Sequence, residues 1–221
     1  MMSTPETREA QFHRIYRFSV ALWYAVSAAL TVVYAVRADM YHLGISLGTF
    51  VVPPFIALFH RLLRLRPSWQ LNTLVLGFIF IAYPLGGCVD FYRVVPCFDK
   101  LAHTLSGVFV SVLCIVLYCA LAPARRIGPQ DMYLALAFTF FGSMAVAGMW
   151  ELGEYAVSAI VKMDLQRVAA TGVSDSMNDM LVCMAGTIAA LPAVARLAKG
   201  RRGVLTSPIR AFVENNFPKK G

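Results

Sequence analysis

Charged side chains are scarce in this sequence. Asp, Glu, Lys and Arg make up only 14% of its 221 residues, whereas 58% are hydrophobic. The mean hydropathy is +0.63, and the apolar share exceeds that of an average soluble domain. The scarcity of charge excludes an ordinary soluble enzyme and leaves no stretch long enough for a separate soluble domain.

Several functional motifs are also missing. The sequence has no glycine-rich phosphate loop, no Cys-x-x-Cys and no nucleophile elbow, so nucleotide binding, thiol redox chemistry and serine hydrolysis are poorly supported. Its apolar runs do not alternate with polar residues, as the strands of a membrane barrel would. No internal repeat is visible, which argues mildly against the commonest transporter folds.

The sequence does contain apolar runs that approach the ~20 residues needed to cross a bilayer as a helix. Six spans are predicted: 16–36, 43–60, 71–88, 101–121, 132–161 and 177–197. The fold class is therefore all-α, a polytopic bundle of six transmembrane helices within residues 1–200, followed by a basic tail at 201–221. Pro53 and Pro54 predict a kink in the second span, because proline removes a backbone donor. Small residues between Gly142 and Gly153 predict that another helix packs closely on the fifth span.

The loop charges predict the orientation. Lys and Arg collect before the first span, between the second and third, between the fourth and fifth, and after the sixth. The positive-inside rule then places both termini in the cytoplasm. The net charge of +8 is accordingly a topology signal, and no nucleic-acid partner is expected. The first apolar stretch is longer than the core of a signal peptide and is interpreted as an anchor.

Ionisable residues inside or beside three of the spans are the strongest functional signal, because charges at membrane depth are costly and usually mark a site. They form pairs spaced by three or four residues, so each pair lies on one helix face. The pairs are Asp99 with His103, Glu151 with Glu154, and Asp175 with Asp179. The predicted topology puts all three pairs at the outer ends of their spans.

If the three faces meet, five carboxylates share one pocket and cannot all stay ionised without compensation. Bound cations, shared protons or basic partners would each relieve the repulsion. Lys100, Arg93 and Arg167 are expected to extend toward head groups or solvent. A divalent metal ion is the simplest remedy, since carboxylates and an imidazole suit Mg²⁺, Mn²⁺, Fe²⁺ or Zn²⁺.

The expected roles divide among eight residues. The expected metal ligands are Asp99, His103, Glu151 and Asp179. Glu154 or Asp175 would act as general base or complete a second metal site, and Ser176 and Asn178 would contact the ligands or the substrate. Helix capping is an equally good explanation for Asp99 or Asp175 taken alone.

Two cysteines leave another alternative open. Cys88 and Cys97 bracket an outward loop, where an oxidising compartment would permit a disulfide. Their proximity cannot be judged from the sequence.

Three segments carry a resemblance to a known family. They are Phe98-Asp99-Lys100-Leu101-Ala102-His103, Trp150-Glu151-Leu152-Gly153-Glu154-Tyr155, and Asp175-Ser176-Met177-Asn178-Asp179-Met180. In these motifs the chain resembles the YjdF-like family of small polytopic bacterial inner-membrane proteins, with Ser176 in place of the family's threonine. The resemblance covers roughly the second half of the chain. It implies a multi-span protein of the bacterial inner membrane and no particular activity.

The preferred hypothesis is a metal-dependent membrane hydrolase whose site opens to the periplasmic face. Its substrate would be a lipid or lipid-linked molecule, because the pocket would lie at head-group depth. A cation- or proton-coupled transporter using the same carboxylates is the second hypothesis. An accessory or scaffold protein with a structural acidic cluster is the third.

Overall fold

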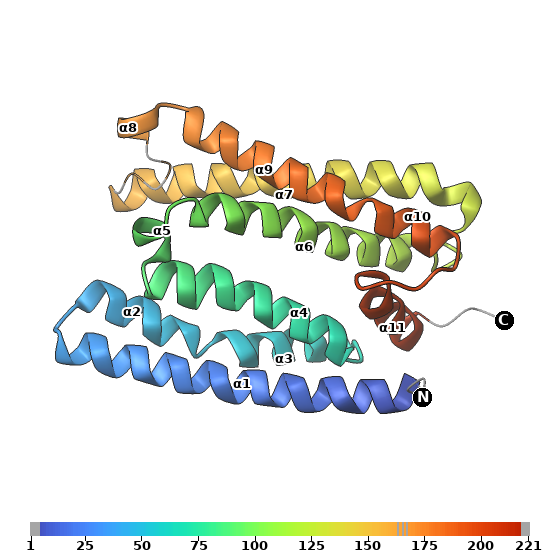
Figure 1. Cartoon of the computed structure of the whole chain (residues 1–221), viewed down its shortest axis with the longest axis horizontal. Coiled ribbons are helices and arrows are strands. Elements are labelled where there is room, and N and C mark those ends of the chain that lie inside the picture. Colours follow the sequence, from blue (N-terminus) through green and yellow to red (C-terminus); the bar gives the residue numbers. More distant parts are fainter. Residues whose placement is uncertain (1–4, 163, 165, 167, 218–221) are drawn as a thin grey trace. The chain divides into compact units, whose positions relative to one another are not determined.

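The computed structural model describes residues 5–162, 164, 166 and 168–217, and these form helices joined by turns with no strand among them (Figure 1). Six stretches of the described chain are long and apolar enough to cross a membrane, namely Glu9–Val36, Met40–Leu62, Trp69–Cys88, Phe98–Leu121, Pro129–Val161 and Ser174–Ala198. Each contains one predicted span, which confirms the all-α, six-span fold class. The helices extend past the predicted ends because polar residues near the interface continue them.

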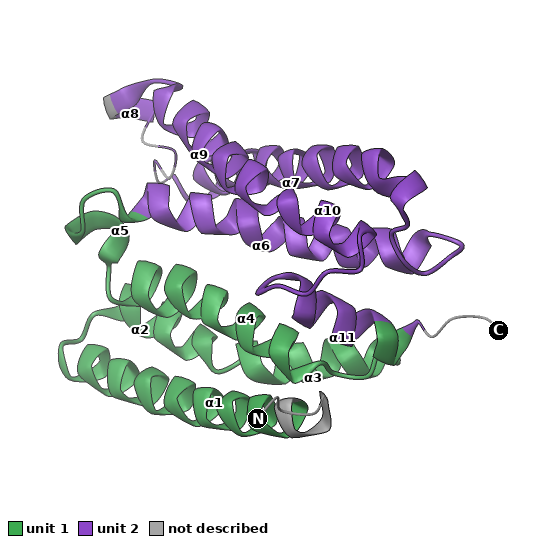
Figure 2. Ribbon diagram, turned by 45° about the vertical axis from the view of Figure 1, so that its right-hand side comes forward, with its two compact units in different colours: residues 1–98, 214–216 green, residues 99–213, 217–221 purple. Residues whose placement is uncertain are grey.

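The chain forms two compact units (Figure 2). Unit 1 comprises residues 1–98 and 214–216, and unit 2 comprises residues 99–213 and 217–221. The elements of unit 1 are α1 (Pro5–Val36), α2 (Met40–Thr49), α3 (Val52–Leu62), α4 (Trp69–Phe80), η1 (Ile81–Cys88) and α5 (Phe91–Val94). Unit 2 holds α6 (Phe98–Leu121), which begins at the boundary, then η2 (Pro129–Asp131), α7 (Met132–Val161), α8 (Val168–Thr171), α9 (Ser174–Ala190) and α10 (Pro192–Ala198).

Unit 1 is built around α1, which packs against α2 and α4. Trp23, Ile56 and Leu76 form its apolar core. The indole of Trp23 donates to the carbonyl of Thr49 at 3.0 Å, so the largest core side chain also has its polar atom satisfied. Asp39 caps α2, and the backbone N–H and imidazole of His42 hold the pKa of its carboxyl below the usual range.

Proline interrupts both of the later spans in unit 1. The second span divides into α2 and α3, and Pro53 lies at the start of α3, where a missing N–H is tolerated. This break confirms the predicted kink. The third span continues from α4 into η1, a π-helical segment that contains Pro84. Such widened turns accommodate a backbone that cannot keep regular α-helical bonding.

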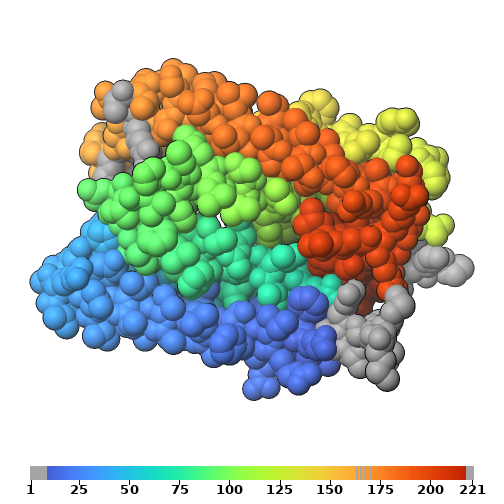
Figure 3. Space-filling view, viewed as in Figure 1, coloured from blue at the N-terminus to red at the C-terminus, as the bar shows by residue number. Residues whose placement is uncertain are grey.

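Unit 2 depends on a close approach of α6 and α9, whose side chains meet along the face of the unit seen in Figure 3. A Cβ atom added to Gly107 would lie 2.0 Å from the carbonyl oxygen of Cys183, and one added to Gly186 would lie 2.0 Å from that of Thr104. Only glycine fits at such a crossing. The predicted close packing on the fifth span is only partly present: Gly142 meets Cys114, whereas Gly148 and Gly153 have open space beside them.

Hydroxyl groups connect the three long helices of unit 2 next to this crossing. Ser143 on α7 and Thr187 on α9 are bonded at 2.8 Å, and both lie 3.5 Å from the carbonyl oxygen of Gly107 on α6. All of these side chains are buried. Such bonds hold membrane helices together where lipid provides no hydrophobic driving force.

The segment predicted as a basic tail contains a helix, α11 (Thr206–Asn216), with Ile209, Phe212 and Val213 buried. The side chain of Asn216 accepts from the N–H of Arg66 at 2.5 Å and donates to its carbonyl at 2.9 Å. All five cysteines are free, with Cys88 buried and Cys97 exposed, so the structure contains no Cys88–Cys97 disulfide.

Candidate charged site on α6, α7 and α9

The start of α6, the end of α7 and the start of α9 lie at the same end of unit 2 (Figure 1). The three ionisable pairs identified in the sequence belong to these three segments. The three ionisable pairs therefore lie at one end of unit 2, as the helix positions in the sequence predict. The close α6–α9 crossing is what brings the first turns of those two helices into contact.

The ammonium group of Lys100 lies at the centre of the site. Its Nζ atom is 2.6 Å from Oδ1 of Asp179, 2.7 Å from Oδ1 of Asp175 and 3.3 Å from Oδ2 of Asp99. Lys100 thus joins α6 to two residues on α9 and compensates three carboxylates at once. Charged pairs of this kind are tolerated at membrane depth because each partner cancels part of the desolvation cost of the other.

The expectation that Lys100 extends toward head groups or solvent is wrong. The side chain retains 28% exposure, and its charged end turns inward to the aspartates. Its partners lie 75 and 79 residues away in the chain, so no local spacing could reveal them. Arg93 pairs with Asp90 in unit 1 at 3.3 Å, and Arg167 lies outside the described residues.

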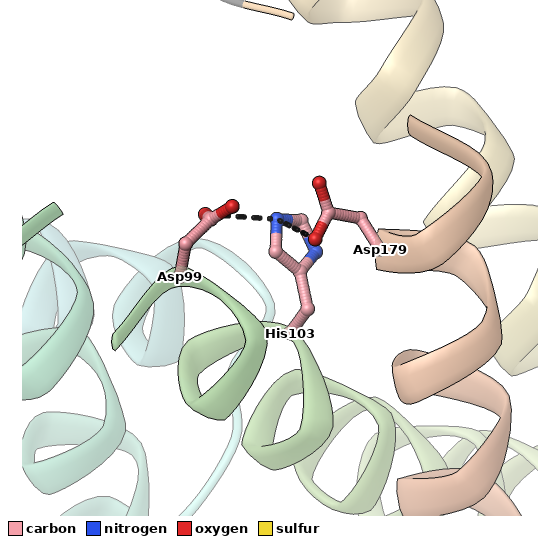
Figure 4. A group of neighbouring side chains, drawn as sticks. All are labelled: Asp99, His103 and Asp179. Carbon is pink, nitrogen blue, oxygen red and sulfur yellow. Dashed lines mark ion pairs between the residues drawn. The ribbon is translucent and has the colours of Figure 1, made fainter. Parts of the chain in front are cut away.

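Asp99, His103 and Asp179 form a compact group of potential metal ligands. One ligand atom from each lies within 4.8 Å of the other two. The His103 Nε2 atom is 3.6 Å from Oδ1 of Asp99 and 3.9 Å from Oδ1 of Asp179. Figure 4 shows the three side chains converging, two from α6 and one from α9. The group is largely enclosed, since the Asp179 side chain is only 6% exposed.

Glu151 and Glu154 lie beside this group on α7. Glu151 is buried, and the side-chain amide of Gln166 donates to its backbone carbonyl at 3.0 Å and to Oε2 at 3.3 Å. Glu154 accepts from the indole of Trp150 at 2.9 Å and lies within electrostatic range of Asp99 and Asp179. Glu154 therefore contributes negative charge near the site, and neither glutamate belongs to the three-residue ligand group.

The two remaining candidates on α9 have different environments. Ser176 is buried, whereas Asn178 is exposed. The N-cap position of α9 is occupied by Val173 without a side-chain bond, and Asp175 bonds Lys100. Asp175 is therefore not the N-cap, although it lies in the first turn of α9, where a carboxylate also interacts favourably with the helix dipole.

Two participants were missed in the sequence. The Lys100 side chain turns inward to aspartates that are distant in the sequence, and Gln166 bonds Glu151 from the loop after α7. A signal for Lys100 exists in hindsight: it is adjacent to Asp99 at the start of an apolar helix, and its flexible four-carbon stem can turn a charge away from solvent. Nothing in the sequence distinguishes Gln166 from other loop residues.

Six apolar spans, with ionisable side chains gathered in three of them, define a polytopic membrane protein. Over residues 18–200 the chain matches the family described as predicted membrane protein (DUF2238), and it belongs to that family. The matched range includes every candidate site residue, which agrees with the resemblance to a polytopic membrane family seen in the short motifs. No curated protein and no solved structure gives a match.

Proposed function

We propose that the protein binds a divalent cation at Asp99, His103 and Asp179 and uses it to hydrolyse a lipid or lipid-linked substrate. The observation that carries the proposal is the convergence of their three ligand atoms within 4.8 Å. Two carboxylates and an imidazole are a donor set that suits Mg²⁺, Mn²⁺, Fe²⁺ and Zn²⁺. A bound ion would lower the pKa of a coordinated water and polarise the bond to be broken.

The other acidic residues have supporting roles in this proposal. Glu154 lies within range of the ligand group and is the candidate general base, with Asp175 as the alternative. Glu151 becomes a fourth ligand only if its carboxylate leaves Gln166. Lys100 competes with the ion, because its ammonium bonds the same Oδ1 atom of Asp179 that belongs to the ligand group.

The proposal includes a location. Loops rich in Lys and Arg alternate with loops poor in them, so the positive-inside rule favours cytoplasmic termini in a bacterial inner membrane. The charged ends of α6, α7 and α9 then open to the periplasmic face. At that depth the reacting group would be at or near a lipid head group.

The position of Lys100 favours a second candidate, cation- or proton-coupled transport. An ammonium held by three aspartates is a tethered cation that a transported ion can replace. Ionisable groups of this kind serve as carriers and relays in pumps. Ion flux into liposomes, abolished by Asp179→Asn, would support transport over hydrolysis.

Metal analysis tests the cation site directly. Wild-type protein purified in detergent is compared with Asp179→Asn and His103→Gln after equilibration with Mn²⁺ or Zn²⁺. We expect one bound ion in the wild type and strong loss in both variants. Asp90→Asn is the matched control, since Asp90 pairs with an exposed arginine in unit 1, and it should bind as the wild type does.

The outcomes separate the three functional classes. Equal metal content in the wild type and both site variants would overturn the cation site. Stoichiometric metal without turnover of lipid substrates, but with flux, would favour the transporter. If removing the metal or the Lys100 pairing lowers only the melting temperature, with neither turnover nor flux detected, the protein would be a scaffold with a structural acidic cluster.

A further inference from the structure

A groove with a volume of about 670 Å³ runs along α7 and α9, two helices that pack against each other. Its described walls include Gly148, Met149, Glu151 and Tyr155 from α7, and Met177 and Met180 from α9. Along α7 the lining extends from Ala145 to Tyr155, which is about 15 Å of helix. The volume lies within the range of known small-molecule pockets.

The walls of the groove are mainly apolar and adaptable. Met149 is 70% exposed and Met177 is 49% exposed. Methionine is unbranched and polarizable, so it packs against partners of varied shape. Because α7 and α9 are both candidate membrane spans, these side chains would face hydrocarbon, and a hydrocarbon chain is the occupant that matches them.

The groove also has one polar point, where Gln166 lines it beside Glu151 and donates to Oε2 at 3.3 Å, which among the described contacts leaves Oε1 of Glu151 for an occupant. Glu151, with 8% exposure, and the buried Ser176 line it from opposite helices. Among the described lining residues there is no Lys, Arg or His. A carboxylate accepts hydrogen bonds and attracts positive charge, so a matching occupant carries an ammonium or hydroxyl group at this point.

The polar point adjoins the charged site through α9. Asp175 and Asp179 turn toward Lys100, whereas Ser176 and Met180, each one residue further along, line the groove. A chain lying in the groove with its polar end at Glu151 would therefore have that end next to the turn of α9 that carries Asp175 and Asp179.

We propose that this groove binds the hydrocarbon chain of a bilayer lipid, and that Glu151 and Ser176 hold a hydrogen-bond-donating part of its head group. The proposal names the substrate class of the charged site and in that respect rests on the proposed function. Binding itself requires only the groove. It can therefore be tested without turnover.

Two glycines on α7 provide a matched pair of variants. A side chain added at Gly148 meets no atom within 4 Å and would extend into the groove. Gly153 has the same open space but does not line the groove. Leucine is a better helix former than glycine, so Gly148→Leu and Gly153→Leu should both fold.

The probe is a phosphatidylethanolamine with a photoactivatable diazirine on its acyl chain, in phosphatidylcholine liposomes. After illumination, mass spectrometry locates the attached residues. We expect attachment to concentrate on Met149, Met177 and Met180. Gly148→Leu should reduce it severalfold, because the leucine side chain occupies space that the acyl chain would fill, and Gly153→Leu should not reduce it.

The head-group part of the proposal has its own readout. A phosphatidylcholine probe with the same chain lacks N–H donors, so the wild type should attach the ethanolamine probe more strongly. Glu151→Gln should remove that difference while leaving the chain in the groove. Equal attachment of both probes to the wild type would overturn the role of Glu151.

Other results would overturn the groove itself. Attachment at the groove methionines no stronger than at Tyr133 and Leu134, which are exposed on α7 outside it, would mean ordinary lipid contact. So would equal attachment in Gly148→Leu and Gly153→Leu. Metal content is measured on the same samples: if Asp179→Asn keeps its metal while groove attachment persists, the proposed function fails and the lipid site stands.

Discussion

The two units use buried polar groups in different ways. Within the candidate spans of unit 1 the one acidic residue is Glu9, at the very start of the first span. The spans of unit 2 contain six: Asp99, Asp131, Glu151, Glu154, Asp175 and Asp179.

Unit 1 joins its helices with neutral hydroxyl groups, as unit 2 also does through Ser143 and Thr187. Thr49 bonds the hydroxyl of Ser27 at 2.7 Å and the carbonyl of Ser46 at 2.6 Å. Neutral bonds suffice to hold membrane helices together. Unit 2 contains such neutral bonds and the charged groups besides them, so the charged groups are what distinguishes it from unit 1.

The largest effect is expected from Gly186→Ala in unit 2. The added Cβ would lie 2.0 Å from the backbone oxygen of Thr104, which cannot move without displacing α6. We expect a loss of about 3 kcal/mol, at the upper end for overpacking, together with a weakened Lys100–Asp179 pair. Thermal unfolding in detergent measures the loss of stability, and metal binding reports the change at the Lys100–Asp179 pair.

Gly77→Ala in unit 1 is the control for that variant. A Cβ at Gly77 meets nothing within 4 Å, so alanine should stabilise the helix by roughly 0.5–1 kcal/mol. Equal melting temperatures for the two alanine variants would contradict the close crossing of α6 and α9.

The next largest effect is expected from Lys100→Met, which leaves three carboxylates without their ammonium partner. Removing one partner of a fully buried pair costs 3–5 kcal/mol, and we expect about 2 kcal/mol here because Lys100 keeps some solvent contact. Divalent metal should restore much of the loss, since it replaces the missing cation. Melting curves with and without Mn²⁺ or a chelator measure both effects.

Arg93→Met is the matched cation control in unit 1, because its pair with Asp90 is exposed. Exposed pairs contribute little, so neither stability nor its metal dependence should change. If metal lowers the melting temperature of Lys100→Met further instead of restoring it, the ion and the lysine do not compete for the same site.

A smaller effect is expected from Thr49→Val, which removes the Thr49–Ser27 bond between α2 and α1 and leaves the Thr31–Ser46 bond in place. Interhelical bonds of this type contribute about 1 kcal/mol in membrane proteins. Thr73→Val is the control, since the Thr73 hydroxyl bonds only within its own helix to Trp69 among the contacts described. Thermal unfolding should show a lower melting temperature for Thr49→Val than for Thr73→Val. If both melt alike, neutral bonding does not hold unit 1 together.

The smallest effect concerns Asp39 and acid pH. The pKa of its carboxyl is lowered in the folded protein, first by the backbone N–H of His42 and then by the His42 side chain. Its ionised form therefore stabilises the fold fully above the unfolded pKa of about 3.9, and this contribution disappears as the pH falls through the lower folded value. Asp39→Asn should show less loss of melting temperature on acidification than the wild type. An identical pH profile would mean that the cap does not contribute to stability.

Much of the fold follows from local patterns. Apolar run length predicts the six spans, and Pro53 predicts the break between α2 and α3. The helical repeat places Asp99 with His103, and Asp175 with Asp179, on shared faces, and the structure brings the two pairs together. These features depend on composition and on the geometry of a single helix, which neighbouring residues in the chain determine.

Contacts between helices could not be obtained in the same way. Gly107 and Gly186 look like any other glycines until α6 and α9 cross, and the small residues of the fifth span that suggested a close contact instead leave Gly148 beside an open groove. The hydrogen bond from Gln166 to Glu151 likewise depends on how the chain folds back after α7. Which glycine meets a backbone and which meets open space depends on the partner helix.

The sequence by itself determined that this is a six-span, all-helical membrane protein with acidic pairs on three of its spans. Only the tertiary structure decided that Lys100 lies among the aspartates and that Glu151 faces an open groove. The physical reason is the range of the interactions. Span length and helix faces depend on residues a few positions apart, whereas the partners of Lys100 are 75 and 79 residues away and meet it only when two helices pack.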